Sequence, residues 1–573
     1  MPRPIDPAAA AGGPRGFSRA DLWAGLIVLA LVLLLAEASR DALAPLPQGG
    51  LQAIRLDPWR LPEYALLTTA RMLVALAFSF LFALIYATAA AKSRSAERLL
   101  IPLLDILQSV PILGFVSVTV VFFLSLTPGR MLGAELAAIF AIFTSQAWNL
   151  AFSLYQSLQS VPEELSEAAR SFRLTAWARF WRLELPFAVP PLVWNAMMSF
   201  SGGWFFIVAA EAISVGPTSV ALPGIGSWIA LAIAERDLGA IGLALLAMLA
   251  VILACDQLLF RPLLAWADRF QLEQEASAAP PPSSPVLIAL RRSRLIALAV
   301  APVAAAWRAT YRIAPPAGWR APRLAAAWAE RSARLLPLLL LALAAWQVIR
   351  IARPALPWAE FTEVLLLGLI TMLRVLVLLA LASLIWVPVG VWIGLRPRLA
   401  RIAEPLAQFL AAFPANLLFP FAVAGILAGG LDPDIWLSPL MILGTQWYIL
   451  FNVIAGAAAI PTELRDAAAS LRLRGLLWWR RVALPAVFPF YVTGAITASG
   501  GAWNASIVAE AVSWGSERLE AQGLGAYIAR ATEAGDLPRL VLGMAVMSCL
   551  VVLINRSFWR PLYRHAEARY RLG

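Results

Sequence analysis

Histidine, lysine and cysteine are almost absent from this chain of 573 residues. It has one histidine, His565, one lysine, Lys92, and two cysteines, Cys255 and Cys549. The cysteines fall in separate apolar stretches with no ligand set beside them, so we expect neither a disulfide nor a metal site. A single histidine near the C-terminus argues against His-based catalysis. The sequence also shows no cluster of nucleophilic residues, which argues against a membrane-embedded enzyme.

Charged residues are also scarce, because they make up 14% of the chain while hydrophobic residues make up 61%. Soluble domains have about 25% charged and about 45–50% apolar residues. Several stretches reach the ~18–20 largely apolar residues that cross a bilayer as a helix, and no alternating pattern suggests a barrel. The sequence therefore predicts an all-α polytopic membrane protein.

The net charge of +12 has to be interpreted by its distribution. Nucleic-acid binding needs basic residues clustered on one exposed face. Here the arginines lie between apolar spans, in alternate loops, as the positive-inside rule requires. We therefore expect the lipid bilayer and not nucleic acid as a partner. We expect a multi-pass protein of a bacterial inner membrane, with its N- and C-termini in the cytoplasm.

The second half of the chain repeats the first. A shift of 299 residues aligns more than a hundred positions without a gap, including Pro162/Pro461, Trp204/Trp503, Ala210-Glu211/Ala509-Glu510 and Gly224-x-Gly226/Gly523-x-Gly525. Further upstream the shift is 303 and pairs Arg71 with Arg374. Compositional bias aligns leucines but not this set of residue types, so we interpret it as an internal duplication.

Each copy is predicted to contain six spans, about twelve in all. The predicted spans are 22–38, 64–91, 99–126, 134–158, 186–214 and 238–259, then 335–351, 362–394, 404–429, 439–459, 486–514 and 538–558. An even number per copy makes the repeats parallel, with a pseudo-two-fold axis near the membrane normal. The first repeat is 1–268 (core about 60–265) and the second is 335–573 (core about 360–563).

Two segments allow more than one interpretation. Residues 15–38 imitate a signal peptide, but we favour an uncleaved first helix because the matching span 335–351 opens the second half. The linker 269–334 has an apolar run, 295–307, that is too short to span and is flanked by arginines. We interpret it as an interfacial helix on the cytoplasmic leaflet.

A helical loop is predicted between the fourth and fifth spans of each copy. The first starts Pro162-Glu-Glu and contains Glu167-Ala-Ala, and the second starts Pro461-Thr-Glu and contains Asp466-Ala-Ala. A proline at the helix start with acids in the first turn makes a good N-terminus. Small alanines let another protein approach closely, so the pattern favours insertion into a partner's groove.

These loops resemble the Glu-Ala-Ala coupling loop of bacterial ATP-binding-cassette importer permeases with the type I fold. Their surroundings are most similar to the nitrate/sulfonate/taurine/bicarbonate branch, and the resemblance covers roughly 60–265 and 360–563. It implies two ATPase subunits that bind the loops and carry the ATP and Mg²⁺, and a periplasmic or lipid-anchored binding protein that delivers the substrate. The chain itself has no Gly-x-x-x-x-Gly-Lys-Ser/Thr loop.

The resemblance assigns coupling to eleven residues. They are Glu163, Glu164, Glu167, Ala168, Ala169, Arg173, Glu463, Asp466, Ala467, Ala468 and Arg472. The family usually has glycine where Arg173 and Arg472 stand, and arginine resists the positive φ that glycine allows. We therefore expect the bend between the two short coupling helices to differ here. Asp466 in place of a second glutamate leaves room for asymmetry between the ATPases.

Polar residues inside the spans are candidates for the translocation path. The uncharged candidates are Gln108, Asn149, Asn195, Trp204, Gln446, Asn452, Trp503 and Asn504. Each can also be explained as a helix–helix contact or as an interfacial tryptophan. Intramembrane charges are costly unless paired. Arg71 with Glu211, and Arg374 with Glu510, are therefore expected as ion pairs; alternatively, the arginines line the path and attract an anion.

The sequence thus favours the transmembrane subunit of an importer for a small anion such as nitrate, bicarbonate or a sulfonate. It favours no enzyme activity and no cofactor in this chain. The alternative is a secondary transporter driven by an ion gradient. Such a protein would need buried carboxylates or unwound helices at mid-membrane and has no use for paired coupling loops.

Overall fold

A computed structural model describes residues 54–270 except 109, 216 and 217, then 284–311 and 345–570, and a few single positions (25, 339, 342 and 343). The predicted span 22–38, apart from one residue, lies outside the described residues. So does part of the predicted span 335–351, of which the continuous described stretch, 345–351, is helical.

The first repeat is built from long helices joined by short elements. In order they are η3 (Pro58–Arg60), α2 (Leu61–Lys92), α3 (Arg94–Leu107), α4 (Ile112–Leu126), α5 (Leu132–Gln159), α6 (Glu163–Ser171), α7 (Ala176–Arg179), the π-helical turn η4 (Phe180–Glu184), α8 (Leu185–Glu211), β1 (Ala212–Val215), β2 (Thr218–Ala221), α9 (Ile225–Ala234), α10 (Leu238–Cys255), η5 (Asp256–Phe260), α11 (Arg261–Ala267) and η6 (Asp268–Phe270). The described part of the linker holds α12 (Pro285–Arg292) and α13 (Arg294–Thr310).

The second repeat follows largely the same order, except that three elements, α18, η8 and α19, take the place of the single helix α5. Its elements are α15 (Trp358–Gly394), α16 (Pro397–Ala412), η7 (Ala415–Leu418), α17 (Phe419–Gly429), α18 (Pro433–Trp436), η8 (Ser438–Met441), α19 (Gln446–Ala458), α20 (Thr462–Ser470), α21 (Gly475–Trp478), the π-helical turn η9 (Trp479–Ala483), α22 (Leu484–Ala509), β3 (Ala511–Trp514), β4 (Glu517–Glu520), α23 (Leu524–Ala534), α24 (Leu537–Ile554), η10 (Asn555–Trp559) and α25 (Arg560–Tyr570). The order of elements agrees with the duplication.

Seven helices in the described residues are long and apolar enough to cross a membrane, or nine if two bent pairs each count as one span. The bent pairs correct the sequence prediction, because 404–429 breaks by 78° near Pro414 and 439–459 bends by 43°. The predicted span 99–126 is likewise two helices, α3 and α4, which separate before Pro111. Proline lacks the N–H that a continuous helix needs, which accounts for the breaks at Pro111 and Pro414.

The predicted spans 186–214 and 486–514 are too long at their C-terminal ends. Helix α8 ends at Glu211 and α22 ends at Ala509, and each is followed by a two-stranded antiparallel hairpin. In the first hairpin Ala212 pairs with Ala221, and in the second Ala511 pairs with Glu520. The short helices α9 and α23 follow. Apart from these hairpins, the described chain is the predicted all-α membrane protein.

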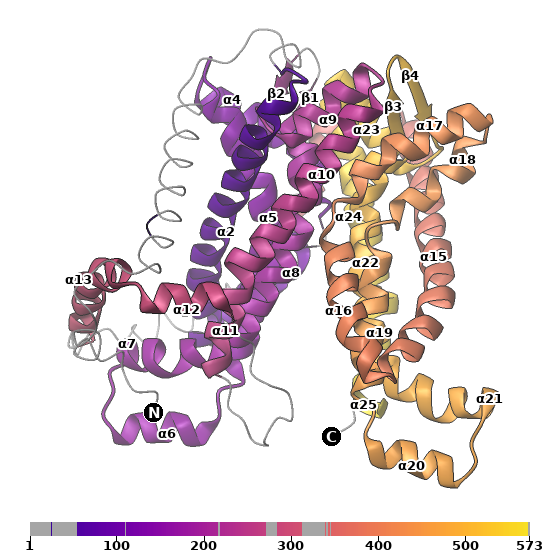
Figure 1. Cartoon of the computed structure of the whole chain (residues 1–573). Coiled ribbons are helices and arrows are strands. Elements are labelled where there is room, and N and C mark those ends of the chain that lie inside the picture. Colours follow the sequence, from indigo (N-terminus) through magenta and orange to yellow (C-terminus); the bar gives the residue numbers. More distant parts are fainter. Residues whose placement is uncertain are drawn as a thin grey trace.

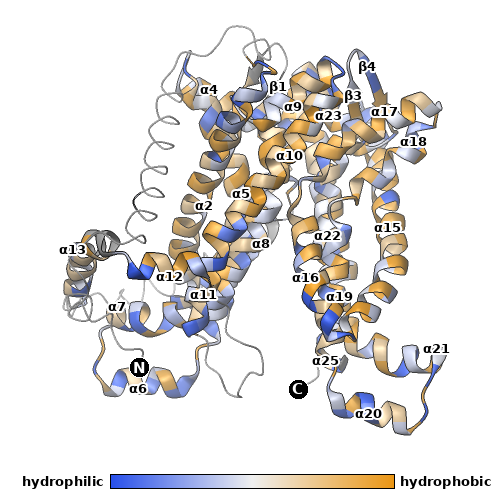
Figure 2. Cartoon of the chain, viewed as in Figure 1, coloured by the Kyte–Doolittle hydropathy of each residue, from blue (hydrophilic) through white to orange (hydrophobic). Residues whose placement is uncertain are grey.

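The two repeats lie side by side with the same orientation (Figure 1). Helices α6 and α20 lie at one end, here called the inner end, and both hairpins lie at the other, the outer end. The long helices between them are predominantly hydrophobic (Figure 2). The repeats contact each other through α8 and α16, α4 and α22, and α9 and β3. At the outer end, Arg236 Nη2 lies 2.9 Å from Glu517 Oε1, and the Gly515 N–H donates to the Ile233 carbonyl.

Candidate coupling surface, ion networks and translocation path

Helices α6 and α20 present similar residues at equivalent positions at the inner end. Each follows a proline N-cap, Pro162 or Pro461, and carries glutamate in its first turn. The exposed side chains are Glu163, Glu164, Glu167, Ala168, Arg173, Glu463, Asp466, Ala467 and Arg472. Only the second alanine of each motif, Ala169 or Ala468, is buried. That alanine anchors the helix and leaves its acidic face accessible.

The bend after each of these helices is left-handed. Arg173 has φ 52° and Arg472 has φ 50°, so both occupy the region that glycine prefers. The Leu174 N–H donates to the Ala169 carbonyl and the Arg173 N–H to the Arg170 carbonyl, which is the hydrogen-bond pattern of a Schellman cap. The second repeat has the same pattern. The expectation of a different bend is therefore wrong: the cap's hydrogen bonds hold arginine in the strained conformation.

An apolar residue projects from each bend, and sequence reasoning did not single it out. Phe172 is 72% exposed and Leu471, at the equivalent position, is 73% exposed. Large apolar side chains that stand in water at equivalent places of two repeats mark an interaction surface. Their recurrence directly before the two arginines was the available signal.

Arg71 lies in a buried network of the first repeat. Its Nε atom is 2.6 Å from Glu135 Oε2, and its Nη1 atom is 2.7 Å from Glu211 Oε1. The Thr68 hydroxyl also donates to Glu211 Oε1. The side chains of Arg71, Glu135 and Glu211 are 4%, 9% and 0% exposed. Arg71 is thus enclosed between two carboxylates, of which sequence reasoning missed Glu135.

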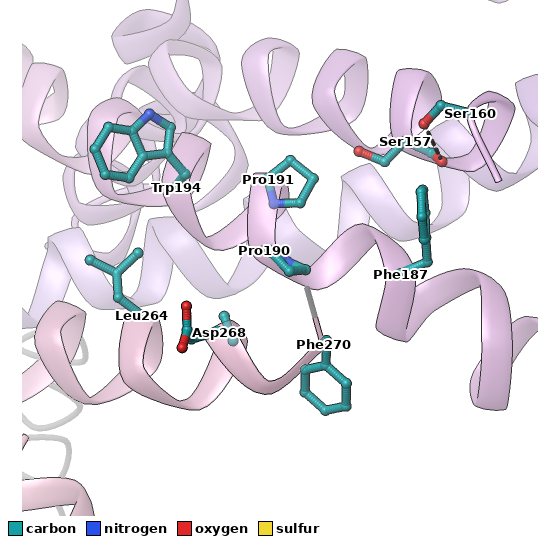
Figure 3. A pocket seen from close by; sticks show the side chains of 10 residues that line it. Ser157, Ser160, Phe187, Pro190, Pro191, Trp194, Leu264, Asp268 and Phe270 are labelled. Carbon is teal, nitrogen blue, oxygen red and sulfur yellow. Dashed lines mark hydrogen bonds between the residues drawn. The ribbon is translucent and has the colours of Figure 1, made fainter. Parts of the chain in front are cut away.

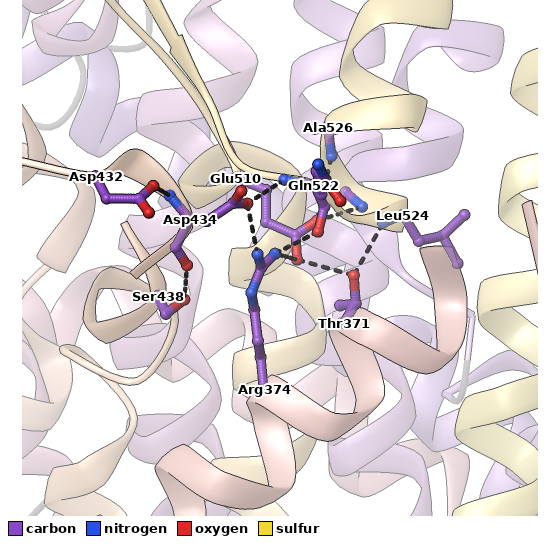
Figure 4. A network of polar contacts seen from close by, with 10 residues as sticks. Thr371, Arg374, Asp432, Asp434, Ser438, Glu510, Gln522, Leu524 and Ala526 are labelled. Atoms are coloured by element: carbon purple, nitrogen blue, oxygen red, sulfur yellow. Dashed lines mark hydrogen bonds and ion pairs between the residues drawn. The ribbon is translucent and has the colours of Figure 1, made fainter. Parts of the chain in front are cut away.

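The second repeat has an equivalent but more open network (Figure 4). Arg374 Nη2 lies 2.8 Å from Asp434 Oδ1, and Nη1 lies 3.4 Å from Glu510 Oε1. Asp434 stands at the position equivalent to Glu135, but its side chain is 41% exposed. Asp434 also accepts the Gln522 N–H at 2.6 Å. The two networks therefore share their chemistry and differ in their access to solvent.

In both networks, the glutamate is hydrogen-bonded to the Gly-x-Gly segment that follows the hairpin. The Gly226 N–H donates to Glu211 Oε2 at 2.7 Å, and the Gly525 N–H donates to Glu510 Oε2 at 2.7 Å. These N–H groups belong to the first turns of α9 and α23, where a carboxylate is favoured by the helix dipole. The paired Ala-Glu and Gly-x-Gly motifs are therefore the two halves of one contact.

Several path candidates are engaged in bonds within and between helices. Asn195 Nδ2 donates to Ser153 Oγ at 3.0 Å, between α8 and α5. Gln446 Oε1 accepts the Trp386 indole N–H at 2.8 Å, between α19 and α15. Asn452 Nδ2 donates to a carbonyl of its own helix. The contacts of Asn195 and Gln446 match the alternative that such residues join helices, whereas the bond of Asn452 lies within one helix.

The other path candidates have different surroundings. Trp204 and Trp503 are each 1% exposed and are core residues. Asn149 and Gln108 are exposed, the first on α5 and the second in the turn between α3 and α4. Asn504, of the predicted set, lines a cavity between the repeats. It also joins the repeats directly, because its Oδ1 accepts the Ile112 N–H at 2.8 Å.

That central cavity has a volume of about 100 Å³. It is lined from both repeats by Ser201, Gly202, Phe205, Phe206, Ala411, Ala412, Phe413, Ala415, Leu440, Met441, Gly444, Thr445, Tyr448, Gly501, Asn504 and Ala505. No charged side chain is among these described lining residues. The Thr445 Oγ1 atom is buried and has no partner in the described structure, so a polar group is available to a small guest.

A larger cavity of about 550 Å³ opens near the inner end of the first repeat (Figure 3). Pro190, Pro191 and Trp194 of α8 line it opposite Asp268. The Trp194 ring lies 6.3 Å from that of Phe451 in α19, so the cavity borders the second repeat. No group of three or more His, Cys, Asp or Glu side chains that could hold a metal occurs in the described part of the chain.

The geometry is that of a multi-pass membrane protein made of two equivalent units. Residues 61–263 and 386–569 each match the family described as "Binding-protein-dependent transport system inner membrane component", and together they cover more than half of the chain. The chain therefore belongs to this family, as a tandem duplication, which confirms the resemblance.

Relatives named for bicarbonate and nitrate import match part of the chain. The bicarbonate transport system permease protein CmpB of Synechococcus elongatus is 28% identical over 178 residues, which cover 31% of this chain and 60% of that protein. The nitrate import permease protein NrtB of Leptolyngbya laminosa is 25% identical over 182 residues, 32% of this chain and 62% of that protein. The matched segment thus spans about 60% of the length of these relatives.

Proposed function

We propose that the chain is the fused transmembrane subunit of an ATP-driven importer in a bacterial inner membrane. One observation carries the proposal. Helices α6 and α20 each expose an acidic face at one end of the molecule, and each is followed by a projecting apolar residue, Phe172 or Leu471. Two equivalent surfaces fit two copies of a partner, and an amphipathic helix is suited to a partner's groove.

In this proposal the partners are two ATPase subunits at the inner end. ATP and Mg²⁺ bind to those subunits, and this chain binds neither. The inner end faces the cytoplasm, which agrees with its many arginines, Arg170, Arg173, Arg465 and Arg472 among them. A substrate-binding protein, periplasmic or lipid-anchored, docks at the outer end, where the hairpins lie. The termini are cytoplasmic.

The substrate we propose is a small anion of the bicarbonate or nitrate kind. The names of the relatives support this class. The central cavity holds hydroxyl and amide groups from Ser201, Thr445, Tyr448 and Asn504, and its volume of about 100 Å³ suits a small guest. Arg71 is enclosed between two carboxylates, which argues against the alternative that it attracts the anion along the path.

The experiment is to purify the tagged chain from its native host in mild detergent and to measure the ATPase that co-purifies. Replacing the projecting residues by charge, in Phe172→Glu and Leu471→Glu, is expected to lower the co-purified ATPase activity about tenfold or more for each variant, because such anchors dominate binding. The double variant is expected to lose it completely.

Trp59→Glu is the matched control, because Trp59 is 90% exposed in η3, before the outer end of α2. It should leave the co-purified ATPase unchanged. Uptake into vesicles separates the alternatives. Uptake that persists after ATP depletion and stops when the ion gradient is collapsed would contradict the proposal and identify a secondary transporter.

A further inference from the structure

The linker between the repeats packs against α7 and η4, which follow α6 in the first predicted coupling loop (residues 163–184). Near the C-terminal end of α13, the Trp307 ring lies 4.6 Å from that of Trp181 in η4 and 6.0 Å from that of Trp177 in α7. The Trp177 indole N–H donates to Thr310 Oγ1 at 2.9 Å. Turn η4 joins the α6–α7 loop to the membrane helix α8. The linker therefore touches the segment that connects α6 to the membrane helix α8.

Within the described residues, the second repeat shows no equivalent contact. Leu476 and Arg480 stand where the first repeat has Trp177 and Trp181, and Leu476 is 84% exposed. Aromatic pairs of this kind contribute about 0.5–1.5 kcal/mol each beyond the area they bury. The sequence of the first repeat thus specifies where the linker docks.

Beyond that contact, the α13 side chains whose burial is described are largely apolar and exposed. Leu298 is 72% exposed, and Ala301, Pro302, Ala305 and Ala306 are also exposed. A mostly apolar helix in water is unfavourable, because each exposed Å² costs about 25 cal/mol relative to an apolar environment. Figures 1 and 2 show α13 beside the first repeat, near the level at which the long helices reach the inner end.

The described part of the linker carries only positive charges. Residues 284–311 contain four arginines and no acidic residue. Arg291, Arg292 and Arg308 are exposed on α12 and α13. A helix with an apolar face and basic flanks lies in the interface of a membrane, and anionic headgroups attract each basic residue near the surface.

We infer that α12 and α13 form a binding surface for anionic phospholipid headgroups at the inner leaflet. Arg291, Arg292 and Arg308 pair with the headgroups, and Leu298 enters the acyl boundary. Through Trp307 the bound surface holds the first coupling loop, and not the second, against the membrane. Lipid binding stands independently of the proposed function, whereas any effect on an ATPase rests on it.

The test uses the full chain with Cys255→Ala and Cys549→Ala, and a fluorophore on Leu298→Cys. The protein is placed in nanodiscs of phosphatidylcholine with increasing phosphatidylglycerol, and quenching by lipids that carry a shallow nitroxide is measured. We expect quenching to rise with the phosphatidylglycerol fraction. The triple variant Arg291→Gln, Arg292→Gln, Arg308→Gln should need about tenfold more phosphatidylglycerol or fail to reach the same quenching.

A fluorophore on Leu476→Cys is the matched control, because Leu476 is exposed on the loop without a linker; its quenching should not depend on the three arginines. Quenching of Leu298→Cys that is equal in neutral and anionic discs would overturn the headgroup assignment. Absence of quenching in both kinds of disc would overturn it as well. If the complex with purified ATPase shows no quenching and quenching appears only when the ATPase is removed, the ATPase and not the lipid occupies the surface.

Discussion

The carboxylate of Glu211 fills the space that a Cβ atom on Gly224 would occupy. The backbone of Gly224 is extended, with φ 177°, so the requirement is for space and not for a special conformation. Glu510 and Gly523 stand in the same relationship in the second repeat. In both repeats the end of a membrane helix is thus closed onto the start of the short helix that follows the hairpin.

Gly224→Ala is therefore expected to displace Glu211 and destabilise the first repeat by roughly 3 kcal/mol, through overpacking and the loss of hydrogen bonds to a buried carboxylate. The measurement is the midpoint of thermal unfolding in detergent, followed by size exclusion. Gly242→Ala is the control, because a Cβ on Gly242 in α10 meets nothing within 4 Å. It should be neutral or stabilising, and equal losses in both variants would contradict the account.

The two arginines should differ in importance although their motifs are the same. Arg71→Met leaves Glu135 and Glu211 buried without a counter-charge, and we expect a loss of about 3–5 kcal/mol. Arg374→Met leaves only Glu510 buried, because Asp434 is 41% exposed, and should cost clearly less. Yields of monodisperse protein and unfolding midpoints measure this difference. A larger loss for Arg374→Met would show that solvent access does not set the cost.

The duplication, the spanning helices and the short helices α6 and α20 were predictable because their signals are local. Pro162 and Pro461 start helices wherever they lie, and long apolar runs must be helical in lipid. The strands β1 and β3, and the bends at Pro111 and Pro414, were missed because apolar composition looks the same in a straight span, a broken helix and a short strand.

The ion networks were predictable only in part. Arg71 and Glu211 are conspicuous because charges inside apolar spans need partners. Glu135 and Asp434 stand near the outer ends of their segments, where a charge needs no explanation, so nothing in the sequence connects them to the arginines. Four of the eight path candidates, Asn195, Gln446, Asn452 and Asn504, form hydrogen bonds within or between helices. Their partners were not predictable, because a polar residue in a span indicates a hydrogen bond but not its partner.

The positive φ angles of Arg173 and Arg472 lead to a prediction about the loops that contain α6 and α20. Arg173→Gly and Arg472→Gly should relieve a strain of about 1–2 kcal/mol, partly offset by the greater freedom of glycine in the unfolded chain. Hydrogen exchange of the Leu174 and Leu473 amides, which close the caps, should slow severalfold. Faster exchange would mean that the arginine side chains stabilise the bends.

Arg236→Gly is the informative contrast. Arg236 also has a positive φ, 58°, and its equivalent in the second repeat is Gly535. Its side chain, however, pairs with Glu517 across the repeats. Relief of strain and loss of this pair should therefore nearly cancel, since an exposed pair contributes about 0–1 kcal/mol.

Trp307→Ala should loosen one coupling loop and leave the other unchanged. The substitution removes the ring contacts to Trp177 and Trp181 that attach α13 to α7 and η4. Hydrogen exchange measured on the full chain should become faster in 176–184, because local opening there no longer has to break these contacts. The equivalent segment 475–483 serves as the control within the same molecule, since it has no linker contact of this kind in the described structure. Equal acceleration in both segments, or in neither, would mean that α13 does not restrain the first coupling loop.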